Sequence, residues 1–89
     1  MIDIATIDVT QEDIAKGDAR NPESCPVALA ASRVCKQPMM AGSYRLHSVM
    51  GATQYRTGAI PKSVQRWIED FDEGRSVEPI KFEVMLYGV

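Results

Sequence analysis

Apolar and polar residues alternate at the start of the chain, and a period of two residues predicts a strand. Ile2 and Ile4 follow this period, and after a shift of one residue the alternation resumes with Ile7 and Val9. Successive side chains of a strand point to opposite faces, so the shift predicts a bulge or a strand end near positions 5–6. A second alternation, of Ile80, Phe82, Val84 and Leu86, predicts a half-buried strand at the other end of the chain.

Three segments carry the start and stop signals of helices. Thr10 and Asp13 have the spacing of a capping box, and Gly17 ends the short helix that they begin. The segment Ser24-Cys25-Pro26 begins a longer helix, which Pro38 terminates. The third helix follows Pro61 and stops at Gly74, and its apolar residues recur at helical spacing: Val64, Trp67, Ile68 and Phe71.

The runs 43–50 and 53–60 read as a hairpin, because a two-residue loop that begins with glycine, Gly51-Ala52, joins them. This loop sets His47 opposite Arg56. One face of the hairpin then holds Tyr44, Leu46, Ser48, Tyr55 and Thr57, and we expect it to meet the core. The other face holds Arg45, His47, Val49, Gln54 and Arg56, and we expect it to meet water.

Together these elements predict one α+β domain spanning residues 1–89, with the order β-α-β-β-α-β and a short extra helix near the N-terminus. A four-stranded, mostly antiparallel sheet with two helices on one face buries both apolar stripes, and a ferredoxin-like topology is favoured. No stretch is long and apolar enough for a membrane helix, and no signal peptide is visible. Ten residues of helix hold Cys25 and Cys35 too far apart for a disulfide, so we expect a cytoplasmic protein.

Three groups of residues resemble a family of small uncharacterised proteins of bacteriophages and prophages. They are Val9-Thr10-Gln11-Glu12-Asp13-Ile14 with Gly17; Cys25-Pro26-Val27-Ala28-Leu29-Ala30; and Pro61, Val64, Trp67-Ile68, Phe71-Asp72 and Gly74, followed by Val77, Pro79 and Ile80-Lys81-Phe82-Glu83. The resemblance covers most of the chain except the hairpin. It implies a phage accessory protein, and it brings no reaction, cofactor or catalytic residue with it.

Charge is strongly segregated along the chain, although the net charge is only −2. Residues 24–68 contain six basic residues and no acidic one, whereas the segments on either side each contain six acidic and two basic residues. Two candidate binding surfaces follow. One is basic, on the hairpin face: Arg45, His47, Gln54 and Arg56. The other is acidic, at the end of the third helix: Glu69, Asp70, Asp72 and Glu73.

Few residues suggest chemistry. Cys25 lies at a helix N-terminus, where the dipole lowers a thiol pKa, so a reactive thiol is one interpretation and a packed cap residue is the other. His47 is the only histidine, and the acids of 69–73 are interpreted as a solvated face rather than as paired catalytic carboxylates. We therefore predict no catalytic constellation, no cofactor and no metal site.

Two hypotheses of function remain. In the first, the chain is a non-enzymatic accessory protein that binds and modulates a host or phage protein. In the second, it binds nucleic acid or a nucleotide through Arg45 and Arg56, with Tyr87 available for stacking. The acidic pI of about 5.3 argues against broad affinity for nucleic acid. Neither hypothesis involves a membrane, and the oligomeric state is left open.

Overall fold

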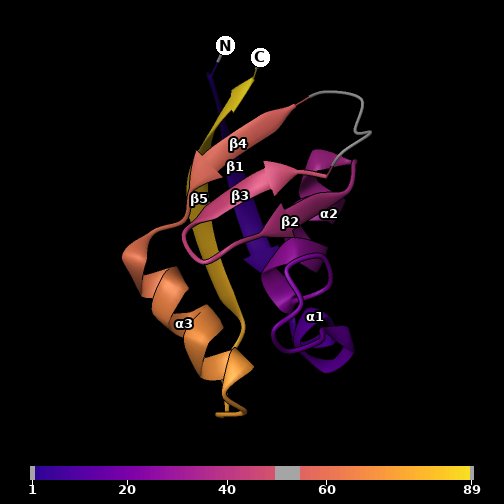
Figure 1. Cartoon of the computed structure of the whole chain (residues 1–89), viewed down its shortest axis with the longest axis vertical. Helices are drawn as coiled ribbons and strands as arrows, with labels where there is room; N and C mark the ends of the chain where they lie inside the picture. The colour runs from indigo at the N-terminus through magenta and orange to yellow at the C-terminus, as the bar shows by residue number, and fades with distance from the viewer. Residues whose placement is uncertain (1, 50–54, 89) are drawn as a thin grey trace.

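A computed structural model of the chain describes residues 2–49 and 55–88. It confirms the α+β class, with five strands and three helices among these residues (Figure 1). In chain order the elements are β1 (Ile2–Val9), α1 (Gln11–Lys16), α2 (Pro26–Cys35), β2 (Met39–Ala41), β3 (Arg45–Ser48), β4 (Arg56–Ala59), α3 (Lys62–Asp72) and β5 (Ile80–Gly88). The predicted Gly51-Ala52 turn lies outside the described residues.

The five strands form one sheet in the order β1-β5-β4-β3-β2, and all four neighbouring pairs are antiparallel. The predicted strand count of four is therefore too low, because residues 39–41 pair with β3 as an additional edge strand. The ferredoxin-like topology is not confirmed. A split β-α-β unit joins parallel strands, whereas α3 joins β4 and β5, which are antiparallel neighbours, and β1 lies at an edge.

β1 is continuous, and all eight of its residues pair with β5 in a single register. The bulge predicted near positions 5–6 is therefore wrong. The phase shift has a different cause: Ile7 and Val9 point into the core and are fully buried, whereas Ile4 points to the other face and is 66% exposed. The two halves of β1 thus place their apolar side chains on opposite faces of the sheet.

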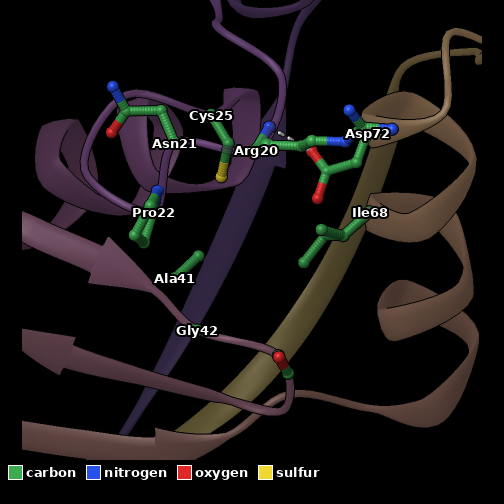
Figure 2. A pocket seen from close by; sticks show the side chains of 9 residues that line it. Arg20, Asn21, Pro22, Cys25, Ala41, Gly42, Ile68 and Asp72 are labelled. Atoms are coloured by element: carbon green, nitrogen blue, oxygen red, sulfur yellow. Dashed lines mark hydrogen bonds between the residues drawn. The ribbon is translucent and has the colours of Figure 1, made fainter.

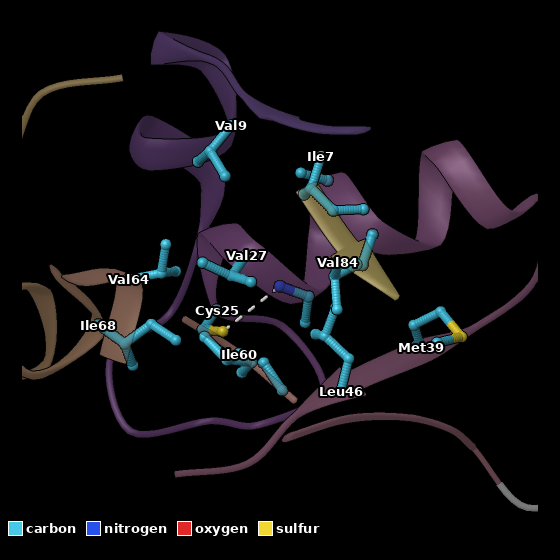
Figure 3. Close-up of a cluster of buried hydrophobic side chains, with 14 of the residues drawn as sticks. Ile7, Val9, Cys25, Val27, Met39, Leu46, Ile60, Val64, Ile68 and Val84 are labelled. Carbon is cyan, nitrogen blue, oxygen red and sulfur yellow. Dashed lines mark hydrogen bonds between the residues drawn. The ribbon is translucent and has the colours of Figure 1, made fainter. Parts of the chain in front are cut away.

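The core lies between the inner face of the sheet and the helices α2 and α3 (Figure 3). Small side chains let α2 lie close to the strands, since Ala28, Ala30 and Ala31 are fully buried. In the predicted stripe of α3, Val64, Trp67 and Ile68 are buried and Phe71 is partly buried. The Trp67 indole N–H donates to the Glu78 carbonyl at 2.8 Å. The strands contribute buried residues to the same cluster, as does Ile60 directly after β4: Ile7, Val9, Met39, Leu46, Val84 and Leu86.

α2 packs against both edge strands, β1 and β2, so the sheet curls around this helix. Its side chains also satisfy main-chain groups of the edges. The Ser32 hydroxyl accepts from the Met39 N–H at 2.9 Å and donates to the Met39 carbonyl at 3.3 Å. On the opposite edge, the Arg33 guanidinium donates to the Asp8 carbonyl at 2.8 Å. One helix therefore protects parts of two edges that would otherwise present unpaired main chain.

Asp13 ties α1 to α2. Its carboxylate accepts from the Thr10 N–H at 2.9 Å and completes the predicted capping box. Both carboxylate oxygens also accept from the Arg33 guanidinium, at 2.8 and 2.9 Å. Burial raises the pKa of this carboxyl group, but the hydrogen bonds from Arg33 and Thr10 outweigh burial, so the pKa lies below its ordinary value.

The space at Gly58, where β4 lies against β5, yields a prediction. A Cβ atom there would lie 2.3 Å from the Met85 carbonyl oxygen and 3.0 Å from the Val84 side chain, so backbone would have to move. We expect Gly58→Ala to destabilise the fold by about 2–3 kcal/mol, as overpacking does. Gly42→Ala is the control, because its nearest contact is 3.5 Å. Urea unfolding of both variants checks this, and equal midpoints would contradict the described packing.

The lowered pKa of Asp13 predicts a pH-dependent contribution to stability. A group whose pKa is lower in the folded state stabilises above its unfolded pKa, near 3.8, and loses that contribution as the pH falls through the folded value. At neutral pH we expect Asp13→Asn to cost about 1–2 kcal/mol in urea unfolding. The cost should shrink below about pH 4. Glu12→Gln, which removes an exposed ion pair with Lys16, should show little effect at either pH.

Candidate functional site

Large apolar side chains are exposed together on the outer face of the sheet, the face opposite α2 and α3. Ile4 and Met85 are directly paired across β1 and β5, so they share this face, and Tyr87 follows two residues after Met85. The exposed fractions are 66% for Ile4, 48% for Met85 and 43% for Tyr87. Scattered apolar residues are normal on a surface, but a contiguous group is typical of an interaction site.

Basic side chains continue the same face across the sheet. Tyr87 pairs with Thr57, and Thr57 pairs with His47 of β3. Arg45, two residues before His47, is exposed, and its Nε donates to the Thr57 hydroxyl at 3.3 Å. The Thr57 hydroxyl donates in turn to the Leu46 carbonyl at 3.1 Å, and this hydrogen bond fixes the position of the hydroxyl. We call this surface the outer-face patch: Ile4, Arg45, His47, Met85 and Tyr87.

Arg56 does not belong to the outer-face patch, and this corrects the predicted basic surface. The observed register pairs His47 with Thr57 rather than with Arg56. Arg56 therefore lies on the inner face, where its guanidinium forms an ion pair with Asp3. A slip of one residue exchanges the two faces of a strand, so Thr57 also moves, from the expected core face to the outer face. Gln54 lies outside the described residues.

The acidic end of α3 is largely engaged within the chain. Arg75 donates to Asp70 at 2.8 Å and to Glu73 at 3.2 Å, and these carboxylates raise the pKa of the guanidinium. Asp72 accepts from the main-chain N–H of Arg20 at 2.8 Å. Glu69 is exposed. The four predicted residues are thus close together, but three of them already accept hydrogen bonds from other residues of the same chain.

Cys25 occupies the predicted N-cap of α2, and its sulfur accepts from the Ala28 N–H at 3.4 Å. Of the two interpretations of Cys25, these observations favour the packed cap residue: burial raises the pKa of the thiol, as does the nearby charge of Asp72, and hydrogen bonds from the helix do not offset them. Figure 2 shows the sulfur facing a small pocket of about 210 Å³, between the loop that holds Arg20 and Pro22 and the α3 residues Ile68 and Asp72.

Comparisons with protein-family models, with curated proteins and with solved structures found no match. The resemblance to small phage proteins stays a prediction. None of the described helices has the length and hydropathy needed to span a membrane. Within residues 2–49 and 55–88, no three side chains of the metal-ligating types come together as a cation site requires.

The sequence pointed to Arg45 and His47, and to Tyr87 as a stacking residue, but Ile4 and Met85 were missed as part of a binding surface. A signal was present in the alternation itself. In β5, Met85 and Tyr87 stand at the alternate positions that are polar earlier in the strand. In β1, Ile4 is an odd number of residues from Ile7 and Val9, so it belongs to the other face. Apolar residues in both phases at the end of a strand indicate that both faces are apolar there. The sequence alone could not show that these residues are neighbours, because that depends on the pairing of β1 with β5.

The raised pKa of Cys25 predicts slow alkylation. Only the thiolate reacts, and Cys25 is 3% exposed, so we expect iodoacetamide to modify it at least about tenfold more slowly than in the urea-unfolded chain. Cys35 is half-buried and should react faster than Cys25, although burial raises its pKa too. Peptide mass spectrometry at several times measures both rates in one sample. Modification of Cys25 at the unfolded rate would contradict its assignment as a packed cap.

Proposed function

We propose that this protein is a small, non-enzymatic accessory protein of the phage type, which binds another protein of phage or host and modulates it. The outer-face patch is the observation that carries the binding part of this proposal. Tyr, Met and Arg are enriched at protein interfaces, and all three types are present in the patch. The phage part rests on the sequence resemblance.

The composition of the patch defines the chemistry of the partner. The exposed apolar side chains of Ile4, Met85 and Tyr87 favour an apolar centre on the partner's surface. Arg45, which the Thr57 hydroxyl holds over the face, favours an acidic residue beside that centre. Burial of the apolar group would supply affinity, and the charge pair would supply orientation and specificity.

The alternative, binding of nucleic acid or a nucleotide, has less support. It depended on two arginines sharing one exposed face, and Arg56 is on the other face in an ion pair with Asp3. Arg45 and Tyr87 remain on the outer face, and a single arginine beside an aromatic ring is a small phosphate and stacking surface. We therefore retain nucleic acid as an outcome of the test rather than as a second proposal.

The test compares three immobilised proteins: wild type, Met85→Lys and Ala15→Lys. Met85→Lys places a charge at the centre of the patch, and Ala15→Lys places the same charge at an exposed position of α1. We expect a bacterial protein, quantified by mass spectrometry and then purified, to bind wild type and Ala15→Lys equally. Its affinity for Met85→Lys should fall about tenfold or more, as for a central interface residue.

Two results would overturn the proposal. One is that no captured protein distinguishes Met85→Lys from wild type. The other is that the captured material is nucleic acid: it disappears after nuclease treatment, and a labelled oligonucleotide binds with a steep dependence on salt. Circular dichroism of all three proteins checks that the substitutions leave the fold intact.

A further inference from the structure

The outward edge of β1 is open over part of its length. In an antiparallel ladder, alternate residues turn their N–H and C=O groups toward one neighbour or away from it. The Asp8 carbonyl accepts from Arg33, so it points away from β5. Ile4 and Thr6 are an even number of residues from Asp8, so their N–H and C=O groups also point away from β5. In the described part of the chain, no side chain or loop bonds these outward groups of Ile4 and Thr6.

The opposite edge of the sheet is covered more fully. On β2, the Ser32 hydroxyl bonds both main-chain groups of Met39, and the Ala41 N–H donates to the Pro22 carbonyl at 2.8 Å. β2 is also only three residues long. Short or covered edges prevent a further strand from pairing, whereas a longer open edge is a template for one. Between the two edges, the first half of β1 is therefore the stretch where a further strand could pair.

A groove of about 380 Å³ runs beside this open stretch, where α2 ends and no longer covers β1. One wall is residues 3–6 of β1, and the other is the end of α2 with Val34, Cys35 and Gln37. Leu86 and Arg56, which forms an ion pair with Asp3, also line the groove. Val34 is 38% exposed, which is unusual for an apolar residue on a helix that otherwise packs its alanines into the core. The small Ala5 side chain leaves room between the two walls. The groove could hold an aliphatic side chain without displacing the core.

We propose that the first half of β1 binds an extended segment of another protein as a sixth strand of the sheet. The main chain of Ile4 and Thr6 would pair with the segment, as in other cases of strand addition. A residue of the segment opposite Ala5 would point inward, and an aliphatic side chain there would fill the groove beside Val34. This inference deepens the proposed function, and it rests on the protein acting by binding another protein.

The acidic charge of β1 is consistent with a segment of another protein that carries a basic residue. The two charged residues of β1, Asp3 and Asp8, are both acidic, and they flank the open stretch. The Asp8 side chain is exposed, and the Asp3 side chain is 49% exposed beside Arg56. A basic residue of an incoming segment near Asp8 would therefore meet an exposed carboxylate, where opposite charges across strands are stabilising, whereas Asp3 is already paired with Arg56.

A second copy of this chain fits the site poorly. If β1 of two copies paired over the open stretch, the inward positions of the incoming strand would be Asp3 and Ala5. A methyl group and a carboxylate would then occupy a groove that has room for an aliphatic side chain. A partner of different sequence can supply the aliphatic side chain.

The experiment selects binders from a displayed library of random octapeptides and measures their affinity for variants. Thr6→Pro removes an outward N–H without disturbing the ladder to β5, because proline is tolerated on an edge strand when its nitrogen faces outward. Thr6→Val is the matched control with an intact N–H. Ala5→Leu fills the groove and keeps the edge. We expect Thr6→Pro and Ala5→Leu each to weaken binding at least about tenfold, and Thr6→Val and Met85→Lys to retain it.

Hydrogen exchange of the bound protein identifies the atoms involved. In the free protein, the Ile4 and Thr6 amides should exchange fast while the Ala5 and Ile7 amides are protected. A bound peptide should protect Ile4 and Thr6 as well. Selected peptides should carry aliphatic residues at alternate positions and a basic residue near one end.

Three outcomes would overturn the inference: no peptide is enriched, the enriched peptides bind Thr6→Pro as well as Thr6→Val, or sedimentation shows a dimer that Thr6→Pro dissociates. The last outcome would assign the edge to a second copy. Failure here is distinguishable from failure of the proposed function. A partner that is lost on Met85→Lys but bound equally by Thr6→Pro and Thr6→Val would leave the outer-face patch in place and remove only the strand addition.

Discussion

The packing of α2 between the two edges of the sheet is the constraint on which the rest of this structure depends. An antiparallel sheet of five strands has two edges, and here one helix of ten residues packs against both. Buried alanines allow that close approach, and Ser32 and Arg33 bond the main chain of the edges on either side. Where α2 ends, at Cys35, its protection ends too. The open half of β1 and the groove beside it are consequences of the helix's length.

The outer-face patch and the open edge meet at Ile4. Its side chain lies on the outer face beside Met85, while its main chain faces away from β5 at the edge. A segment added to the edge would therefore continue the outer face as well as the ladder. Both proposed contacts could belong to one partner, which would bury apolar surface on the face and pair main chain at the edge. Neither contact uses the thiols or the acidic residues that first suggested chemistry.

Ion pairs join some of the charges that are segregated along the sequence. Arg33 pairs with Asp13, Arg56 with Asp3, and Arg75 with Asp70 and Glu73. Two of these pairs join the basic middle of the chain to its acidic first segment, across 20 and 53 residues of sequence. Folding brings opposite charges together because their attraction is strongest at contact distance. Folding therefore pairs two of the six basic residues of segment 24–68 with acidic residues of the first segment.

Local signals in this chain could be interpreted correctly without coordinates, because the physics behind them acts over a few residues. The capping box of Thr10 and Asp13, the helix that begins after Cys25 and the stripe of α3 all belong to this class. The hairpin register was inferred from a turn at 51–52 and failed: the observed pairing of β3 with β4 differs from it by one residue, which moves Arg56 to the opposite face. The order of the strands failed for a related reason. It places β5 between β1 and β4 and leaves β1 at an edge, whereas a ferredoxin-like sheet has its first strand inside, and no pattern within a strand specifies its neighbours.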